Sequence, residues 1–180
     1  AYEPVPATFE KLVHNIQINS LHEKVSPFMV ALTSPLKSES SRELMFSTDR
    51  NCANSFVDNN YPGPAINVET STLDKHCVNK EPVLIKIDVE GFEADVLKGA
   101  SNMLAKKSLL AVIIEGQSEE INQVFKDAGF SDVKYCPLSR TILPHEAKTA
   151  NRIWIRSIMH EEVKKRVKSA PISCIYGNLF

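Results

Sequence analysis

The sequence predicts an α/β fold in which helices flank a mostly parallel sheet. Residues 83–87 are apolar and largely β-branched apart from Lys86, a pattern typical of a strand buried on both faces of a parallel sheet. After Gly91 a set of apolar residues recurs at helical spacing and forms one stripe: Phe92, Val96, Leu97, Ala100, Met103 and Leu104. A second apolar run, 109–114, is again followed by a helical pattern. Strands that alternate with helices favour a parallel sheet.

The N-terminal half predicts one helix and several strands. Pro4 and Pro6 precede a helix, because proline is well tolerated at the first helical position. The apolar face of this helix is formed by Phe9, Leu12, Val13 and Ile16. Strands are expected at 25–33, at 44–46 and at 66–73. The rest of the segment 34–64 is polar and rich in Ser, Asn, Asp and Pro, which indicates a functional or mobile loop.

The C-terminal half predicts two further helices and two strands. Ser118 can cap a helix that Gly129 ends, and strands are expected at 133–136 and 152–156. Residues 157–168 predict a helix whose basic side chains form a solvated face.

Composition limits the kind of partner. The 180 residues carry a formal net charge of −1, which argues against a nucleic-acid or an anionic-membrane partner. No apolar run is long enough to cross a bilayer. The four cysteines form no Cys-x-x-Cys pair, which fits a reducing cytoplasm, and the five histidines form no zinc motif, so no metal site is expected. The oligomeric state stays open.

Acidic residues follow the two central strands. Asp88 and Glu90 come directly after the run 83–87, and Glu115 ends the run 109–114. Ligands of open α/β sheets bind at the carboxyl ends of strands, so these residues are candidates for a functional site. An extended backbone points Asp88 and Glu90 to one side. The alternative is that Glu90 or Glu93 only favours the N-terminus of the following helix through its dipole.

The segment 86–93, read together with 96–100 and 113–115, resembles the FkbM-type S-adenosylmethionine-dependent methyltransferases. The segments 2–6, 9–15 and 72–74 also fit that family, so the resemblance covers roughly residues 1–156. It implies a class I methyltransferase fold, Rossmann-like, that is closed by an antiparallel pair of strands. It also implies methyl transfer from S-adenosylmethionine to a hydroxyl of a sugar or another small acceptor. The expected division is a methyltransferase-like domain at 1–156, with a helix and tail at 157–180 packed on it.

The resemblance assigns roles to the acidic residues. Glu3 would accept hydrogen bonds from the ribose hydroxyls of the cofactor, as a carboxylate does in dinucleotide sites. Asp88 would meet the positive charge of the cofactor and act with Glu90 as a catalytic residue, and Glu115 would contact the acceptor. The family has a first strand and a glycine-rich turn ahead of Glu3. We therefore expect this chain to lack both and to bind the cofactor weakly.

Two rival functions remain open. The segment Asp88–Gly91 loosely resembles the Asp-x-Asp-Gly loop of Mg²⁺-dependent phosphatase-like hydrolases, but Glu90 replaces the second Asp and Phe92 breaks the motif. The other rival is a truncated, catalytically inactive domain or an interaction module on the same scaffold.

Overall fold

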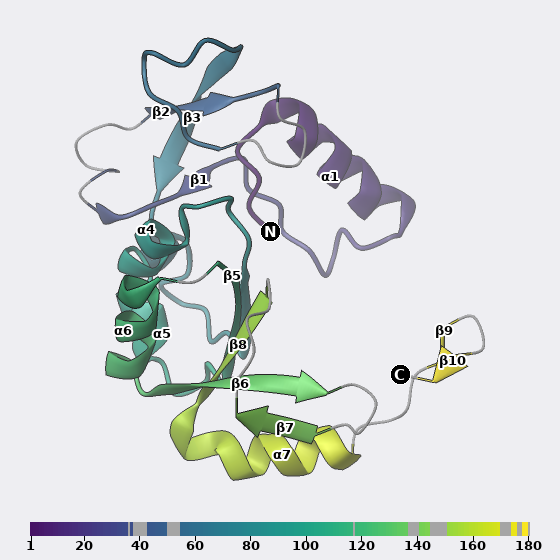
Figure 1. The fold of residues 1–180 in the computed structure, drawn as a ribbon. Helices are drawn as coiled ribbons and strands as arrows, with labels where there is room; N and C mark the ends of the chain where they lie inside the picture. Colours follow the sequence, from purple (N-terminus) through teal and green to yellow (C-terminus); the bar gives the residue numbers. More distant parts are fainter. Residues whose placement is uncertain are drawn as a thin grey trace. The chain divides into compact units, whose positions relative to one another are not determined.

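The computed structural model describes residues 1–35, 37, 43–49, 55–116, 118–136, 141–144, 151–169, 174–175 and 178–179 (Figure 1). These residues divide into two compact units. The first unit contains residues 1–80 and 89–103, and the second unit contains residues 81–88 and 104–180. The expected domain boundary at residue 156 stays a prediction.

Within the described residues, the first unit combines a small sheet with four helices. Its helices are α1 (Pro6–Ile18), α3 (Leu73–His76), α4 (Glu93–Lys98) and α5 (Ser101–Ala105). Its strands are β1 (Ala31–Leu32), β2 (Glu43–Ser47) and β3 (Ala65–Ser71). In the strand order β1-β3-β2, β1 runs parallel to β3 and β2 runs antiparallel to it. Its core gathers Val5, Ala31, Phe46 and Val68.

One of the three strands predicted in this unit is much shorter than expected. The strand expected at 25–33 reduces to β1 and to one isolated parallel bridge between Tyr2 and Phe28. Pro27 has no N–H to donate to a strand ladder, which limits pairing here. The expected strands at 44–46 and 66–73 are confirmed as β2 and β3. Residues 36, 38–42 and 50–54 of the expected loop lie outside the described residues.

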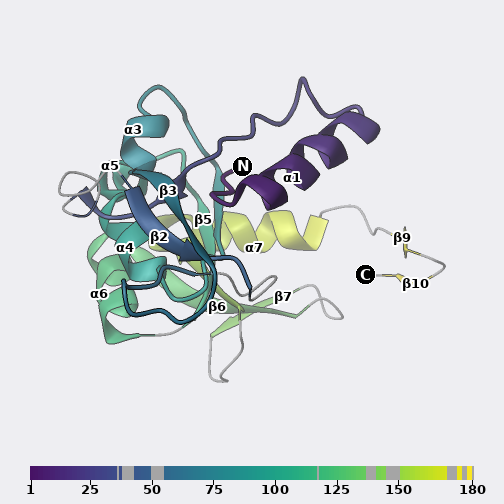
Figure 2. The ribbon, with the colours of Figure 1, turned by 90° about the horizontal axis from the view of Figure 1, so that it is seen from above.

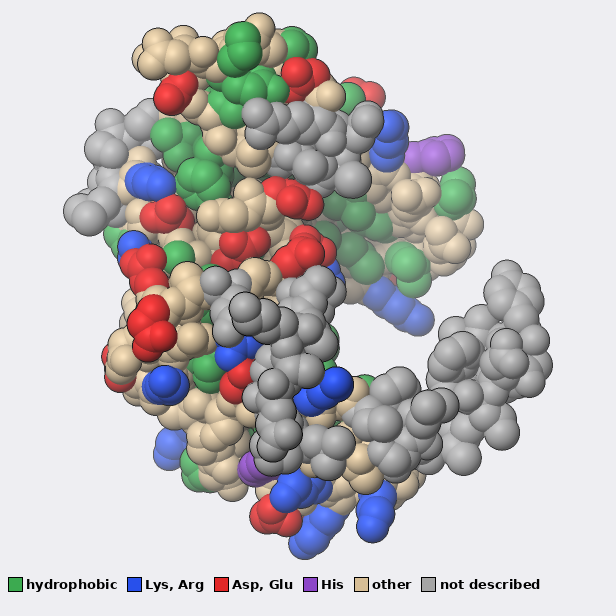
Figure 3. Space-filling view, in the orientation of Figure 1, with side chains coloured by type: hydrophobic (Ala, Val, Ile, Leu, Met, Phe, Trp, Pro, Cys, Tyr) green, Lys and Arg blue, Asp and Glu red, His purple; other side chains and the backbone are tan. Residues whose placement is uncertain are grey.

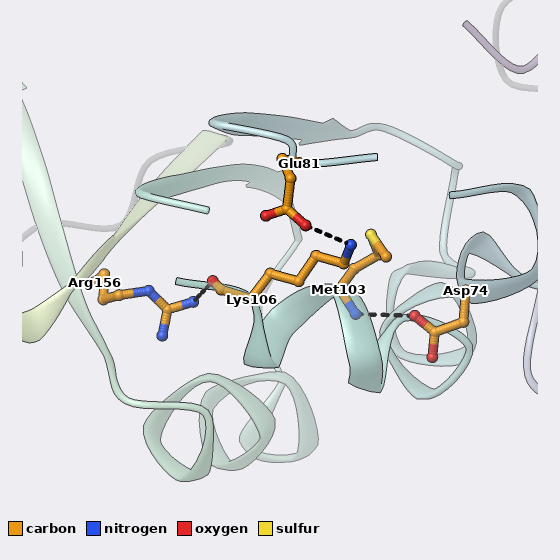
Figure 4. A network of polar contacts seen from close by, with 5 residues as sticks. All are labelled: Asp74, Glu81, Met103, Lys106 and Arg156. Carbon is orange, nitrogen blue, oxygen red and sulfur yellow. Dashed lines mark hydrogen bonds and ion pairs between the residues drawn. The ribbon is translucent and has the colours of Figure 1, made fainter. Parts of the chain in front are cut away.

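The expected helix after Gly91 is broken into α4 and α5 at Gly99. A Cβ atom at Gly99 would lie 2.2 Å from the carbonyl oxygen of Thr33, so the close approach of these two segments requires glycine. Asp74 then caps α5, because its carboxylate accepts the backbone N–H groups of Asn102 and Met103, each at 2.9 Å. Figure 4 shows the bond to Met103. The apolar stripe was predicted correctly, whereas the continuous helix was wrong.

The second unit is built on a five-stranded mixed sheet (Figure 2). Its strands are β4 (Leu84–Ile87), β5 (Ala111–Glu115), β6 (Phe130–Cys136), β7 (Thr141–Pro144) and β8 (Asn151–Arg156), in the order β4-β5-β8-β6-β7. The other elements are α6 (Glu119–Asp127), the 3₁₀ turn η2 (Ser157–Met159), α7 (His160–Ser169), β9 (Cys174–Ile175) and β10 (Asn178–Leu179), of which β9 and β10 pair antiparallel.

The expectation of a mostly parallel sheet was wrong. The pair β4–β5 is parallel, whereas β5–β8, β8–β6 and β6–β7 are antiparallel. A parallel pair needs a long crossover connection, but β6 and β7 are separated by four residues, 137–140, which suits a hairpin. The antiparallel pairing predicted between 133–136 and 152–156 is confirmed as β6–β8.

Helices pack on both faces of this sheet. Trp154 of β8 stacks on Phe125 of α6 with ring centroids 4.6 Å apart. The next residue, Ile155, faces the other side and belongs to a cluster into which Val163 and Val167 of α7 pack. Successive residues of one strand therefore anchor α6 and α7 to opposite faces.

Arg156 ties the loops of the second unit together. Its guanidinium donates hydrogen bonds to four backbone carbonyl oxygens, and Figure 4 shows the one to Lys106, at 2.7 Å. The other acceptors are Leu104 and Leu109 at 2.8 Å and Ala128 at 3.4 Å. The Lys106 side chain in turn pairs with Glu81 at 2.9 Å. One residue of β8 thus satisfies carbonyl groups that precede β5 and that follow α6.

Strand β4 is less covered than the sequence suggested. Among the described residues it pairs only with β5, and Val83 and Leu84 are 57% and 55% exposed. The prediction that 83–87 is buried on both faces was therefore wrong, because one edge of the strand has no partner in the part of the chain that the structure describes.

The surface charges are mixed. Figure 3 shows Lys and Arg side chains gathered at the α7 end of the visible face, with acidic side chains among them. On α7 itself, Lys164 pairs with Glu161 and Arg166 with Glu162, each at 2.9 Å. In the described part of the chain, no helix is both long and apolar enough to cross a bilayer.

Candidate active site

Asp88 follows the end of β4 in the second unit. Its carboxylate forms an ion pair with Lys86, two residues earlier on the same strand. The hydrogen bond from Lys86, followed by one with the Glu115 side chain, lowers the pKa of Asp88 below its usual value. Asp88 is therefore ionised at neutral pH. Lys86, the charged residue within the apolar run 83–87, is thus paired with a carboxylate.

Glu115 lies beside Asp88. In the parallel pair β4–β5, Ile87 is the register partner of Ile114, so the next residues of both strands come opposite each other. Carboxylate oxygens of Asp88 and Glu115 lie within 4.8 Å of each other. The second unit thus presents a carboxyl pair at one strand edge, with Lys86 as its cation.

Glu90 occupies a strained turn in the first unit. The φ angles of Glu90 and Gly91 are 48° and 94°, and the N–H of Phe92 donates to the carbonyl of Val89 at 3.3 Å. Two positive φ angles within a four-residue turn define a type I′ turn, in which Asn-Gly is the favoured pair. A glutamate in the left-handed region costs roughly 1 kcal/mol or more. Strain of this kind at an exposed carboxylate is typical of functional positions.

An aromatic and charged cluster holds the residue that follows this turn. The ring of Phe92 contacts Phe56 with centroids 4.0 Å apart, and Lys37 Nζ lies 4.4 Å from the Phe92 ring centroid. Lys37 also pairs with Asp95 of α4 at 2.8 Å. Sequence reasoning missed these residues, because no spacing along the chain relates Lys37 and Phe56 to position 92. The cluster links Lys37 and Phe56 of the segment 34–64 to the start of α4.

Glu3 precedes α1 and forms two hydrogen bonds in the first unit. Its N–H donates to the carbonyl of Phe28 at 3.1 Å, and its Oε1 accepts the N–H of Val5, the N-cap residue of α1, at 2.8 Å. Burial raises the pKa of Glu3, and the hydrogen bond from Val5 offsets part of that effect. One carboxylate oxygen therefore serves the helix start. Beside Glu3, the Tyr2 ring stacks on Phe28 at 5.3 Å.

The structure thus brings Asp88 and Glu115 together in the second unit, and it describes Glu3 and Glu90 in the first unit. Carboxylate oxygens such as those of Asp88 and Glu115 are also ligands that Mg²⁺ and Ca²⁺ accept, with water completing the coordination shell.

Comparison with known protein families shows which family the chain belongs to. A family model described as the methyltransferase FkbM domain matches residues 1–131, which include Glu3, Asp88, Glu90 and Glu115. The chain belongs to the FkbM methyltransferase family. No curated protein sequence matches this FkbM domain.

A solved structure, methyltransferase FkbM from Methylobacillus flagellatus KT, is similar to this FkbM domain, with a TM-score of 0.50 and 10% sequence identity. The similarity covers 86% of this chain and 35% of that one, so the chain spans about a third of the length of the structure it matches. At this identity the likeness concerns the fold alone. It agrees with a mixed α/β architecture.

Proposed function

We propose that the protein is an S-adenosylmethionine-dependent methyltransferase that acts on a hydroxyl group of a sugar or another small acceptor. The observation that carries the proposal is the FkbM family match across residues 1–131, which includes the strand–turn–helix segment that holds Asp88 and Glu90. The paired acidic residues after β4 and β5 support it, because ligands of open α/β sheets bind at the carboxyl ends of strands.

The ionisation of Asp88 fits a cationic cofactor. Lys86 keeps the pKa of Asp88 low, so this residue presents a negative charge at neutral pH. When bound, S-adenosylmethionine supplies a methyl group to the acceptor oxygen, and its sulfur keeps the electron pair of the broken carbon–sulfur bond. Asp88 holds the positive end of such a ligand. Methyl transfer needs mainly in-line positioning of the two reacting atoms, which is a task for fixed charges of this kind.

Three further carboxyl groups complete the assignment. Oε1 of Glu3 accepts the Val5 N–H, and its second carboxylate oxygen accepts a hydrogen bond from a ribose hydroxyl. Glu90 orients the acceptor hydroxyl and takes its proton as the new bond forms. Glu115, hydrogen-bonded to Asp88, lies on the acceptor side and limits where the hydroxyl can approach.

Calorimetry and turnover test the proposal in the protein that carries this sequence. S-adenosylmethionine should bind, and Asp88→Asn should lower the release of S-adenosylhomocysteine by about a hundredfold while leaving the melting temperature unchanged, because the two side chains are nearly the same size. Glu119→Gln, at the exposed start of α6, is the matched control. Full turnover by Asp88→Asn would remove this residue from the site. A thermal shift with Mg²⁺ and none with S-adenosylmethionine would favour the hydrolase rival.

A further inference from the structure

Glu93 is a buried carboxylate next to the strained turn. The side chain belongs to the first turn of α4, and the residue is 6% exposed. Charged residues are rarely buried to this degree unless they are paired. The contact that the structure gives this carboxylate, within the described residues, is a hydrogen bond that Oε1 accepts from the Gly91 N–H at 3.2 Å. The Oε1 atom of Glu93 therefore points back toward the turn.

The bond from Gly91 acts on the conformation of Glu90. Gly91 is the second of two successive residues with positive φ, and a left-handed glutamate persists only where its surroundings hold it there. The carboxylate of Glu93 fixes the peptide that joins Glu90 to Gly91, because the N–H of that peptide is its donor. Packing of Phe92 between Phe56 and Lys37 holds the other end of the turn.

We propose that Glu93 is a positioning residue for methyl transfer: it holds the Glu90–Gly91 peptide so that the Glu90 carboxylate is presented in its active orientation. This inference rests on the proposed role of Glu90 at the acceptor hydroxyl. The interpretation that Glu93 only favours the helix N-terminus through its charge predicts a different set of mutant effects.

Two substitutions of Glu93 separate these roles. Glu93→Gln keeps a carbonyl oxygen that can accept the Gly91 N–H but removes the charge. Glu93→Leu removes the acceptor, keeps the side-chain volume and suits a buried site. Positioning predicts that Glu93→Leu lowers kcat by about tenfold, the worth of one hydrogen bond, without lowering the melting temperature, and that Glu93→Gln restores most of kcat. A pure charge effect predicts that both variants behave alike.

Amide exchange at Gly91 gives a readout independent of turnover. In Glu93→Leu the Gly91 N–H should exchange about tenfold faster than in the parent protein, while the amides within α4 keep their protection. In Glu93→Gln the Gly91 amide should remain protected. Unchanged exchange in Glu93→Leu would overturn the inference, because the turn would then not depend on this carboxylate.

A double-mutant cycle with Glu90 completes the test. If Glu93 acts through Glu90, adding Glu93→Leu to Glu90→Gln should lower kcat no further, whereas independent losses would multiply and overturn the inference. Asp74→Ala is the matched structural control: it removes the cap of α5, should lower the melting temperature, and should leave kcat unchanged. If Glu93→Leu turns over at the parent rate while Glu90→Gln is slow, the inference about Glu93 is overturned and the proposed role of Glu90 stands. Full turnover by Glu90→Gln would overturn the proposed role of Glu90 and this inference with it.

Discussion

The Oε1 atom of Glu3 accepts a hydrogen bond from the Val5 N–H at 2.8 Å, so a residue assigned to the cofactor also holds the N-cap residue of α1. The two tasks use different properties of the side chain. The helix start needs an acceptor atom, whereas a ribose diol is held best by a charged carboxylate, since charge-assisted hydrogen bonds are roughly twice as strong as neutral ones. Glu3→Gln keeps the first property and removes the second.

We therefore expect Glu3→Gln to weaken the binding of S-adenosylmethionine by about tenfold while preserving α1. Calorimetry gives the affinity, and circular dichroism gives the helix content. Glu10→Gln, exposed on α1, removes the same charge elsewhere on the helix and should bind like the parent protein. Equal affinities for both variants would exclude Glu3 from the cofactor site.

The pH dependence of stability provides a second test of Glu3. Burial raises its pKa above the ordinary 4.5, so the folded state holds the proton more tightly than the unfolded state. The contribution of Glu3 to stability is then greatest below the ordinary value and is lost as pH rises through the raised pKa. Urea denaturation at several pH values should show this decline in the parent protein and a flatter profile in Glu3→Gln. Parallel profiles would contradict the burial effect.

Lys86 should control the charge state of Asp88. Removing the cation with Lys86→Met should raise the pKa of Asp88 toward its ordinary 3.8, because the hydrogen bond from Lys86 is the largest cause of the lowering. Carbon-detected NMR titration of the Asp88 carboxyl measures the change directly. Lys134→Met, on β6, is the control and should leave the titration unchanged. A shift of the same size in both variants would mean that net charge, and not the ion pair, sets this pKa.

Replacing Glu90 with asparagine should raise the stability of the fold and lower turnover. Glu90→Asn introduces the Asn-Gly pair that type I′ turns favour, so we expect the free energy of unfolding to rise by about 0.5–1 kcal/mol. The same substitution replaces the carboxylate with an uncharged amide on a shorter side chain, so turnover should fall. Denaturant melts and S-adenosylhomocysteine release measure the two effects. A destabilised variant would show that the left-handed turn carries no strain at this position.

Arg156 should contribute strongly to the free energy of unfolding. Arg156→Lys cannot reach the carbonyls of Leu104, Lys106, Leu109 and Ala128 together, and partly buried acceptors left without donors are costly. We expect a loss of about 2–4 kcal/mol in the free energy of unfolding, read by denaturant melts. Arg166→Lys, on the exposed face of α7, should change it by less than about 0.5 kcal/mol. If Arg156→Lys lowers the free energy of unfolding as little as Arg166→Lys does, water molecules replace the guanidinium as donors to these carbonyl groups.

Local patterns along the chain predicted most elements, because helical periodicity and apolar runs reflect burial directly. The stripe that includes Val96 and Met103 is buried as expected. The break between α4 and α5 could not be read from it, since that break depends on the contact of Gly99 with Thr33, 66 residues away in sequence. The exposure of Leu84 was not predicted for a related reason. An apolar side chain indicates that a strand is suited to burial, but the sequence does not show whether another element covers it.

The candidate site was predictable where it depended on strand ends. Asp88 directly follows β4 and Glu115 is the last residue of β5, so the parallel register of these two strands brings them together. The contacts of Lys37 with Phe92 and of Glu93 with Gly91 were not predicted. They arise from side-chain directions set by tertiary packing and by a turn whose positive φ at Glu90 is unusual for that residue type.

The open edge of β4 has a practical consequence for handling the protein. A strand whose outer edge pairs with nothing in the described residues, and whose Val83 and Leu84 side chains are exposed, offers a template for intermolecular pairing. Preparations of this 180-residue chain should therefore self-associate with rising concentration, visible as increasing light scattering. A lysine at an edge opposes such pairing, so Leu84→Lys should raise the concentration at which scattering begins, whereas Tyr135→Lys, on β6, should not.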